Sequence, residues 1–193
     1  IEIEDLLEGA SPVYNSTYAD EIKSDDRYKV YNPWHYANME LNENYNSSTK
    51  NSKGDVVQAI RKCIQVLKCK SASKDDKRFY LKLLVHFIGD LHQPLHLGKK
   101  SDRGGNDIKI KWFGKISNLH RIWDSDMIDS SKLSYIELAK NLPRLSPFQK
   151  LQFASSPISV WIDETHAITK MIYKDLSESN NIGYRYRYEN FET

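Results

Sequence analysis

The sequence predicts a mainly α-helical fold with a small irregular or β-hairpin insertion. Apolar residues recur at helical spacing in several segments, such as Val57, Ile60 and Ile64 within residues 55–69. Residues 102–115 break this pattern, because isoleucines there alternate with lysines between glycines. The 193-residue chain can hold one domain with a sizeable core, and it shows no internal repeat or domain boundary, so we expect one domain over residues 1–193.

The composition excludes two broad classes of protein. A formal net charge of +2 with 28% charged residues indicates a solvated surface without the basic excess of a duplex-binding protein. No apolar run approaches the roughly 20 residues that a membrane-spanning helix needs. Cys63 and Cys69 lie six residues apart in a helical pattern, which puts them on different faces and argues against a mutual disulfide.

In the first half of the chain, helical and irregular segments alternate. Helices are expected at residues 2–8, 16–24 and 55–69, an extended or irregular segment at 31–38, and a polar loop at 41–54. Pro33 disfavours helix at Asn32, which is why residues 31–38 are predicted to be extended. A second loop ends at Asp75 and Asp76, either of which could cap the next helix.

The second half is predicted to be helical apart from the insertion and the tail. Helices are expected at residues 76–92, 116–128, 131–142, 147–154 and 157–176. The first ends before Pro94, and the pairs Ser146-Pro147 and Ser156-Pro157 are typical of an N-cap followed by proline at the first helical position. Arginine and tyrosine alternate at 184–188, which favours a solvated or strand-like tail over a nucleic-acid contact.

Histidines and aspartates stand in apolar helices at a repeated spacing. In "HFIGDLHQPLH", His86 and Asp90 are four residues apart and share one helix face, and His96 follows the break at Pro94. His120 and Asp124 repeat the spacing downstream. Unpaired, such groups would each cost several kcal/mol to bury, and a bound metal ion removes that cost. Two pairs and His96 exceed one tetrahedral site, so we predict two or more metal ions, with zinc suited to these ligands.

Each of these residues also has an ordinary structural explanation. A lone histidine on an apolar face is commonly a core residue, and one His-x-x-x-Asp pair can be a surface pair on a helix. His92 lies six residues from His86 and is expected to face away from the pair. His166 has no partner at metal-binding spacing, and we interpret it as structural.

The motifs resemble those of the S1/P1 family of zinc-dependent nucleases. "HFIGDLHQPLH", "DRGGNDIKI" and "NLHRIWDS" occur in the family's order and spacing, and "YADEI" and "WHYAN" resemble two upstream motifs. The match extends over nearly the whole chain. It implies a mostly helical fold like that of phospholipase C and P1 nuclease, with three zinc ions in a cleft.

The resemblance also implies which residues hold the ions. The first zinc would be bound by Asp20, His35, His86 and Asp90, and the second by His96, His120 and Asp124. The third would be held by an N-terminal tryptophan and a histidine, with Asp90 bridging. No such tryptophan or histidine precedes Asp20, and the family's N-terminal segment and last helix are expected to be missing from this sequence.

Further roles follow from the same resemblance. Asp20 would orient or deprotonate the attacking water, and Lys23 stands where the family has an arginine that stabilises phosphate charge. Tyr36 matches the residue on which a base stacks, and Asn38 matches the one that binds the base edge. Asn106 lies in the glycine-rich loop, where a direct substrate role is possible.

The expected activity is hydrolysis of single-stranded DNA or RNA to 5′-phosphorylated products, with 3′-nucleotidase activity. A zinc phospholipase C-like phosphodiesterase is one alternative, although that class has glutamate at the position of Asp124. The other is an inactive metal-binding fragment of the nuclease. The expected partners are single-stranded nucleic acid or nucleotides, without a membrane or an obligate protein, and the family implies a secreted or periplasmic location.

Overall fold

The computed structural model describes residues 3–176, 181–182, 186 and 189. The first half comprises α1 (Ile3–Leu6), α2 (Tyr18–Glu21), the 3-10 helices η1 (Ile22–Ser24) and η2 (Asp26–His35), α3 (Val56–Lys68) and α4 (Lys74–His92). Two 3-10 turns follow, η3 (Pro94–Leu97) and η4 (Lys100–Asp102), then strands β1 (Lys109–Trp112) and β2 (Lys115–Asn118). The remainder comprises α5 (Leu119–Arg121), the π-helical turn η5 (Ile122–Asp126), α6 (Met127–Ser131), α7 (Tyr135–Asn141), α8 (Pro147–Ser155), α9 (Ile158–Asp175) and β3 (Asn181–Ile182). The predicted mainly α-helical class is confirmed.

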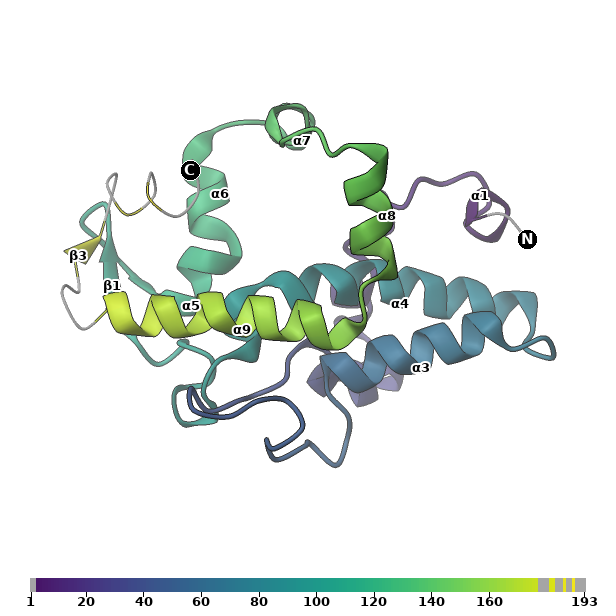
Figure 1. Cartoon of the computed structure of the whole chain (residues 1–193), viewed down its shortest axis with the longest axis horizontal. Coiled ribbons are helices and arrows are strands. Elements are labelled where there is room, and N and C mark those ends of the chain that lie inside the picture. Colours follow the sequence, from purple (N-terminus) through teal and green to yellow (C-terminus); the bar gives the residue numbers. More distant parts are fainter. Residues whose placement is uncertain (1–2, 177–180, 183–185, 187–188, 190–193) are drawn as a thin grey trace.

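Helices α3 and α4 lie side by side and form the main core (Figure 1). Each begins at a capping side chain: Asp55 accepts from the backbone N–H of Gln58, and Ser73 accepts from that of Asp76. The predicted cap at Asp75 or Asp76 was therefore wrong by two to three positions, because the serine hydroxyl precedes them. The fully buried residues of α3 and α4 include Ile60, Leu83, Phe87 and Leu91. Burying each such side chain contributes about 1.5–3 kcal/mol.

Residues 31–35 end a 3-10 helix where an extended or irregular segment was predicted over 31–38, whereas Tyr36, directly after them, is extended as predicted. Residues Asp26–His35 form the 3-10 helix η2, with Pro33 inside it. A 3-10 helix has three residues per turn, so Tyr28, Tyr31 and Trp34 lie on one face. Tyr28 and Tyr31 pack against Phe79 of α4, with ring centroids 5.8 and 5.5 Å away. This aromatic packing outweighs the local effect of proline.

The predicted hairpin is present, but its second strand takes residues that were assigned to a helix. Strand β1 pairs antiparallel with β2, with Lys109 opposite Asn118 and Trp112 opposite Lys115. The turn between them uses Phe113 and Gly114, both with positive φ. Helix was predicted from residue 116, whereas it begins at Leu119 after the cap Asn118, because the turn at Gly114 commits residues 115–118 to pairing. Strand β3 adds in parallel to β1, which was not expected.

Helices α7, α8 and α9 follow the predicted order with shifted starts. Helix α7 begins at Tyr135, not residue 131, because Lys132 has φ +58° and Ser134 forms a capping box with Glu137. Helix α8 has the predicted Ser146 cap with Pro147 at its first position, whereas Pro157 itself occupies the cap position of α9. Figure 1 shows α7 and α8 as an arch that stands away from α9, and both carry exposed apolar side chains.

The cysteines, the absence of long apolar runs and the tail complete the comparison with the sequence predictions. Cys63 is buried and Cys69 is exposed, and both thiols are free, as their spacing predicts. Within the described part of the chain, no helix is long and apolar enough to cross a bilayer. The predicted tail at 184–188 lies outside the described residues except for Tyr186, whose hydroxyl accepts from Trp123 Nε1 at 2.9 Å.

Candidate metal centre

All the predicted metal-binding residues except His86 line a cavity of about 560 Å³, and His86 lies directly behind His35, with its Nε2 3.1 Å from His35 Nδ1. Two groups of ligand atoms lie beside the cavity, each with its atoms within 4.8 Å of one another. We call them the first group (Asp20, His35 and His86) and the second group (His96, His120 and Asp124). The first draws on α2, η2 and α4, and the second on η3, α5 and η5. The fold therefore brings together residues from six separate elements.

In the first group, one ring nitrogen of His35 and one of His86 lie close to each other. The carboxylates of Asp20 and Asp90 lie next to both nitrogens. His35 Nδ1 lies 3.1 Å from His86 Nε2. Asp90 Oδ2 lies 2.8 Å from His35 Nδ1 and 3.0 Å from His86 Nε2, and Asp20 Oδ1 lies 3.7 Å from each. These separations bracket the spacing of about 3.3 Å between ligands of a tetrahedral zinc ion with bonds of about 2.0–2.1 Å.

Asp90 lies between the two groups and contacts both. Its Oδ2 faces the first group, while Oδ1 lies 3.2 Å from His96 Nδ1. Burial alone would raise the pKa of Asp90, but the neighbouring imidazoles of His35, His86 and His96 hold that pKa well below its usual range. The carboxylate is therefore ionised at any physiological pH, which is the state that a cation requires.

In the second group, the two histidine rings are stacked, and the partly exposed carboxylate of Asp124 lies beside them. The centroids of His96 and His120 are 5.2 Å apart, with an interplanar angle of 17°. Asp124 Oδ1 lies 3.8 Å from His96 Nε2, and its side chain is half exposed. Burial lowers the pKa of His120, which favours the neutral imidazole that binds metals.

Backbone carbonyls orient one histidine in each group. His86 Nδ1 donates to the Ser16 carbonyl at 2.6 Å, and His120 Nδ1 donates to the Gly104 carbonyl at 2.8 Å. We assign the proton of both rings to Nδ1, which leaves the Nε2 lone pair directed into the group. Metal-binding histidines are held by such a second hydrogen bond in many proteins.

The glycine pair after η4 allows this contact. Gly104 and Gly105 have φ of +61° and +82°, which glycine adopts more readily than other residues. A Cβ on Gly104 would collide with the Leu95 carbonyl oxygen and come 3.5 Å from His120 Nδ1. The position thus needs glycine for both conformation and space.

A buried ring nitrogen without a hydrogen-bond partner also agrees with a zinc site. His96 Nδ1, which faces Asp90 Oδ1 at 3.2 Å, is buried without a hydrogen-bond partner among the described residues. Native proteins rarely leave such atoms unpaired, and functional or ion-binding sites are among the recognised exceptions. Imidazole and carboxylate donors in two sets are the ligands that zinc accepts.

Of the other residues considered in the sequence, Lys23 lines the cavity, whereas His92 and His166 do not. Lys23 Nζ lies 2.5 Å from Asp20 Oδ1, so this cation already faces the first group. His92 belongs to neither group: its Nδ1 bonds to the Ile88 carbonyl, and its ring lies 5.8 Å from Trp161. His166 is buried in α9 and is likewise in neither group.

The predicted substrate residues line the same cavity. Tyr36, Asn38 and Asn106 all lie on its wall, and Tyr36 is 39% exposed. The amide of Asn106 donates to the Arg103 carbonyl, which keeps this side chain on its own loop. Tyr36 thus offers an aromatic face to whatever enters the cavity.

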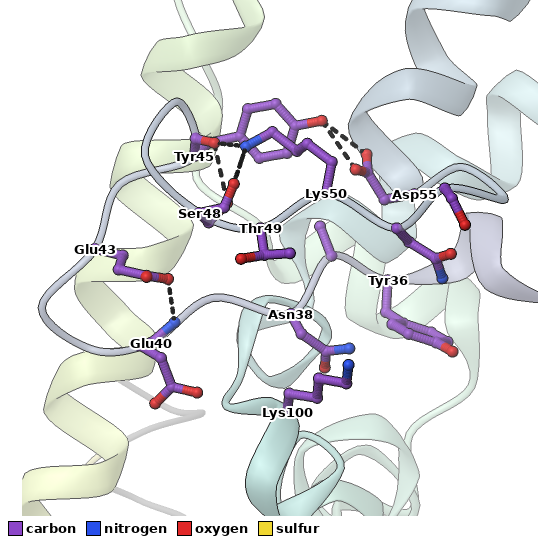
Figure 2. A pocket seen from close by; sticks show the side chains of 13 residues that line it. Tyr36, Asn38, Glu40, Glu43, Tyr45, Ser48, Thr49, Lys50, Asp55 and Lys100 are labelled. Atoms are coloured by element: carbon purple, nitrogen blue, oxygen red, sulfur yellow. Dashed lines mark hydrogen bonds between the residues drawn. The ribbon is translucent and has the colours of Figure 1, made fainter.

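A second cavity of about 450 Å³ adjoins the first across Tyr36 and Asn38 (Figure 2). It lies under the loop that was predicted at residues 41–54. Lys100 lines both cavities, and Arg103 lines the first. Sequence reasoning missed both, because the "GKKSDR" segment has no periodicity that would place its side chains. Ser16, which orients His86 through its carbonyl, gave no signal at all.

Comparison with known proteins agrees with this geometry. The family model described as S1/P1 Nuclease matches residues 3–193. Endonuclease 4 of Arabidopsis thaliana is 31% identical over 189 residues, which cover 90% of this chain and 62% of the relative. Nuclease S1 of Aspergillus oryzae is 31% identical over 125 residues, which cover 62% of this chain and 43% of the relative. The chain thus spans less than two thirds of either relative's length. Because the family match extends over nearly the whole sequence, this protein belongs to the S1/P1 nuclease family.

Proposed function

We propose that this protein is a zinc-dependent nuclease and 3′-nucleotidase that hydrolyses phosphate esters of single-stranded DNA or RNA. The observation that carries the proposal is the pair of His/Asp groups beside one cavity, with Asp90 between them. The cavity also presents an exposed aromatic ring, which gives a base a place to stack. Relatives named endonuclease and nuclease are each 31% identical to the matched part of this chain.

Zinc is the cofactor that the donor set would hold, with Asp20, His35, His86 and Asp90 at the first site and His96, His120 and Asp124 at the second. Bound there, zinc would supply Lewis-acid stabilisation of the phosphate and acidify a water molecule. The family's third zinc would also use Asp90.

The chain's own residues hold and orient the reactants. Asp20 Oδ1 faces both histidines of the first group at 3.7 Å, so its carboxylate can accept a proton from the attacking water. Lys23 lies beside that carboxylate and places a positive charge where phosphate oxygens would lie. Lysine lacks the bidentate geometry of the family's arginine, so we expect a less strictly oriented phosphate contact.

Substrate selection follows from stacking. A base laid on Tyr36 gains about 1–3 kcal/mol whatever its identity, and Asn38 can bond its edge. Only an unstacked base can reach a ring on a cavity wall, so a single strand should bind better than a duplex. A net charge of +2 gives no compensating attraction for duplex backbone.

The test uses the zinc-loaded chain with a single-stranded oligonucleotide and the matched duplex. We expect the single strand to be cut at least tenfold faster, 5′-phosphorylated ends, and loss of activity in a chelator. Phosphate release from a 3′-mononucleotide measures the nucleotidase activity in parallel. Equal rates on both strands, or cleavage that survives chelation, would contradict the proposal.

We also propose that residues 1–193 form one nuclease-like domain and that the protein acts outside the cytoplasm. Both expectations come from the family resemblance. Expression with a compartment-specific tag tests the second.

A further inference from the structure

The second cavity has no role in the function proposed so far. It lies between the loop 40–52 and η4 and shares Tyr36, Asn38 and Lys100 with the metal-lined cavity. Figure 2 shows Lys100 reaching up toward Asn38, with Tyr36 beside it. A ligand that occupied both cavities would pass these three side chains.

Lys100 differs from the other cations of the metal-lined cavity in its charge balance. Lys23 is paired with Asp20 at 2.5 Å, and Arg103 is paired with Asp107 at 2.9 Å. Across the residues that the structure describes, no carboxylate lies within salt-bridge distance of Lys100, although its neighbour Lys99 lies 3.3 Å from Asp102. Its exposed ammonium group is therefore an uncompensated positive charge at the junction of two cavities.

Lys50, the other lysine that lines the second cavity, is already bound by backbone carbonyl groups. Lys50 Nζ bonds to the Tyr45 carbonyl and to the Ser48 carbonyl at 2.8 Å, and lies 4.0 Å from the centre of the Tyr45 ring. Figure 2 shows it turned toward Tyr45, away from Asn38. The lining also includes the uncharged polar groups of Thr49, Asn51 and Ser52 and, as acceptors, the carboxylates of Glu40, Glu43 and Asp55, of which Asp55 already accepts from the Tyr45 hydroxyl.

We propose that the second cavity receives the nucleotide next to the one that stacks on Tyr36, and that Lys100 binds the phosphate between them. The chemistry fits one ligand class. A nucleotide chain brings a phosphate at the junction, which needs an unpaired cation. The adjoining sugar and base bring hydroxyl and amino donors, which suit the carboxylates and amides farther in. Lys100 is then a specificity-determining residue that favours oligonucleotides over mononucleotides. This proposal rests on the proposed nuclease function.

The test compares a two-phosphate ligand with a one-phosphate ligand. The zinc-loaded chain is titrated by calorimetry with a 5′-phosphorylated deoxyadenosine dinucleotide carrying a phosphorothioate linkage, and separately with deoxyadenosine 5′-monophosphate. Lys100→Met should weaken dinucleotide binding about fivefold and mononucleotide binding by less than about twofold. The slope of log affinity against log salt for the dinucleotide should fall by about 0.7. Lys115→Met on exposed β2 removes the same charge outside both cavities and is the control.

The outcomes separate this proposal from the nuclease function. Equal losses for both ligands, or no loss for the dinucleotide, overturn the role of Lys100 even if the chain cuts DNA. A Lys100-dependent dinucleotide preference in a chain that cuts no single strand supports the subsite and contradicts the nuclease function. Failure of the zinc-loaded chain to bind either ligand overturns both.

Discussion

Asp90→Asn is the substitution that we expect to damage the centre most. It keeps the size of the side chain and removes the negative charge between the two groups. Asp90 Oδ2 lies 2.8 Å from His35 Nδ1 and 3.0 Å from His86 Nε2. Each charge-assisted hydrogen bond is worth about 1.5–3 kcal/mol, so the two together amount to about 3–6 kcal/mol. A dication at the same place would interact at least as strongly.

That energy sets the size of the expected effect on metal binding. At about 1.4 kcal/mol per tenfold, zinc affinity at the first group should fall by at least about 10²–10⁴. The assay is zinc per chain after dialysis against a buffer of fixed free zinc, with turnover of single-stranded DNA measured on the same sample. Asp129→Asn on α6, an exposed aspartate outside both groups, is the matched control. If Asp90→Asn retained full zinc and near-normal turnover, the position of Asp90 between two ions would be wrong.

Four further predictions concern other parts of the molecule. His120→Ala should remove about one zinc per chain, because it deletes one of three second-group ligands, and unchanged metal content would refute that assignment. Tyr36→Ala should raise KM for single-stranded DNA about tenfold through lost stacking while zinc content stays constant; loss of zinc would instead indicate a structural role. In the native protein, Cys69 should react with a thiol reagent and Cys63 should not. Cys69 is exposed and its pKa is lowered, whereas burial raises the pKa of Cys63 to about 12. A Cys69→Ser variant that still reacts quickly would disprove this. Burial lowers the pKa of His166, so the folded chain binds fewer protons there than the unfolded chain, and stability falls as pH drops below about 6.5. In urea titrations of chelated protein, His166→Gln should therefore lose less unfolding free energy than the native chain between about pH 7.5 and pH 5.5. An unchanged loss would count against this role of His166.

Helical spacing predicted the local parts of the centre. The four-residue interval places His86 Nε2 and Asp90 Oδ2 3.0 Å apart on α4, as expected for neighbours on one face. The same interval brings His120 and Asp124 into one group, although the chain between them passes through a π-helical turn. In both cases the geometry depends on one stretch of backbone, so sequence alone suffices.

Pairings across the chain could not be obtained in this way. The 3.1 Å approach of His35 to His86 depends on how η2 packs on α4, and only the family resemblance indicated it. The proline rule also failed at η2, because it describes backbone preference and not the packing of Tyr31 and Trp34. Their spacing of three residues was the available signal. Lys100 was missed for the related reason that a short irregular loop places its side chains through contacts and not through periodicity.

Because of the chain positions of the two groups, zinc bound at both of them would act as a reversible cross-link. The first group joins residues 20, 35 and 86, and the second joins residues 96, 120 and 124. An ion that binds only the folded chain therefore closes several large loops at once and stabilises that state by mass action, adding about 1.4 kcal/mol for each tenfold rise in free zinc above the dissociation constant. Partial unfolding and proteolysis should then respond to metal supply as steeply as catalysis does. A protein of this design would lose activity and be degraded together when zinc becomes scarce.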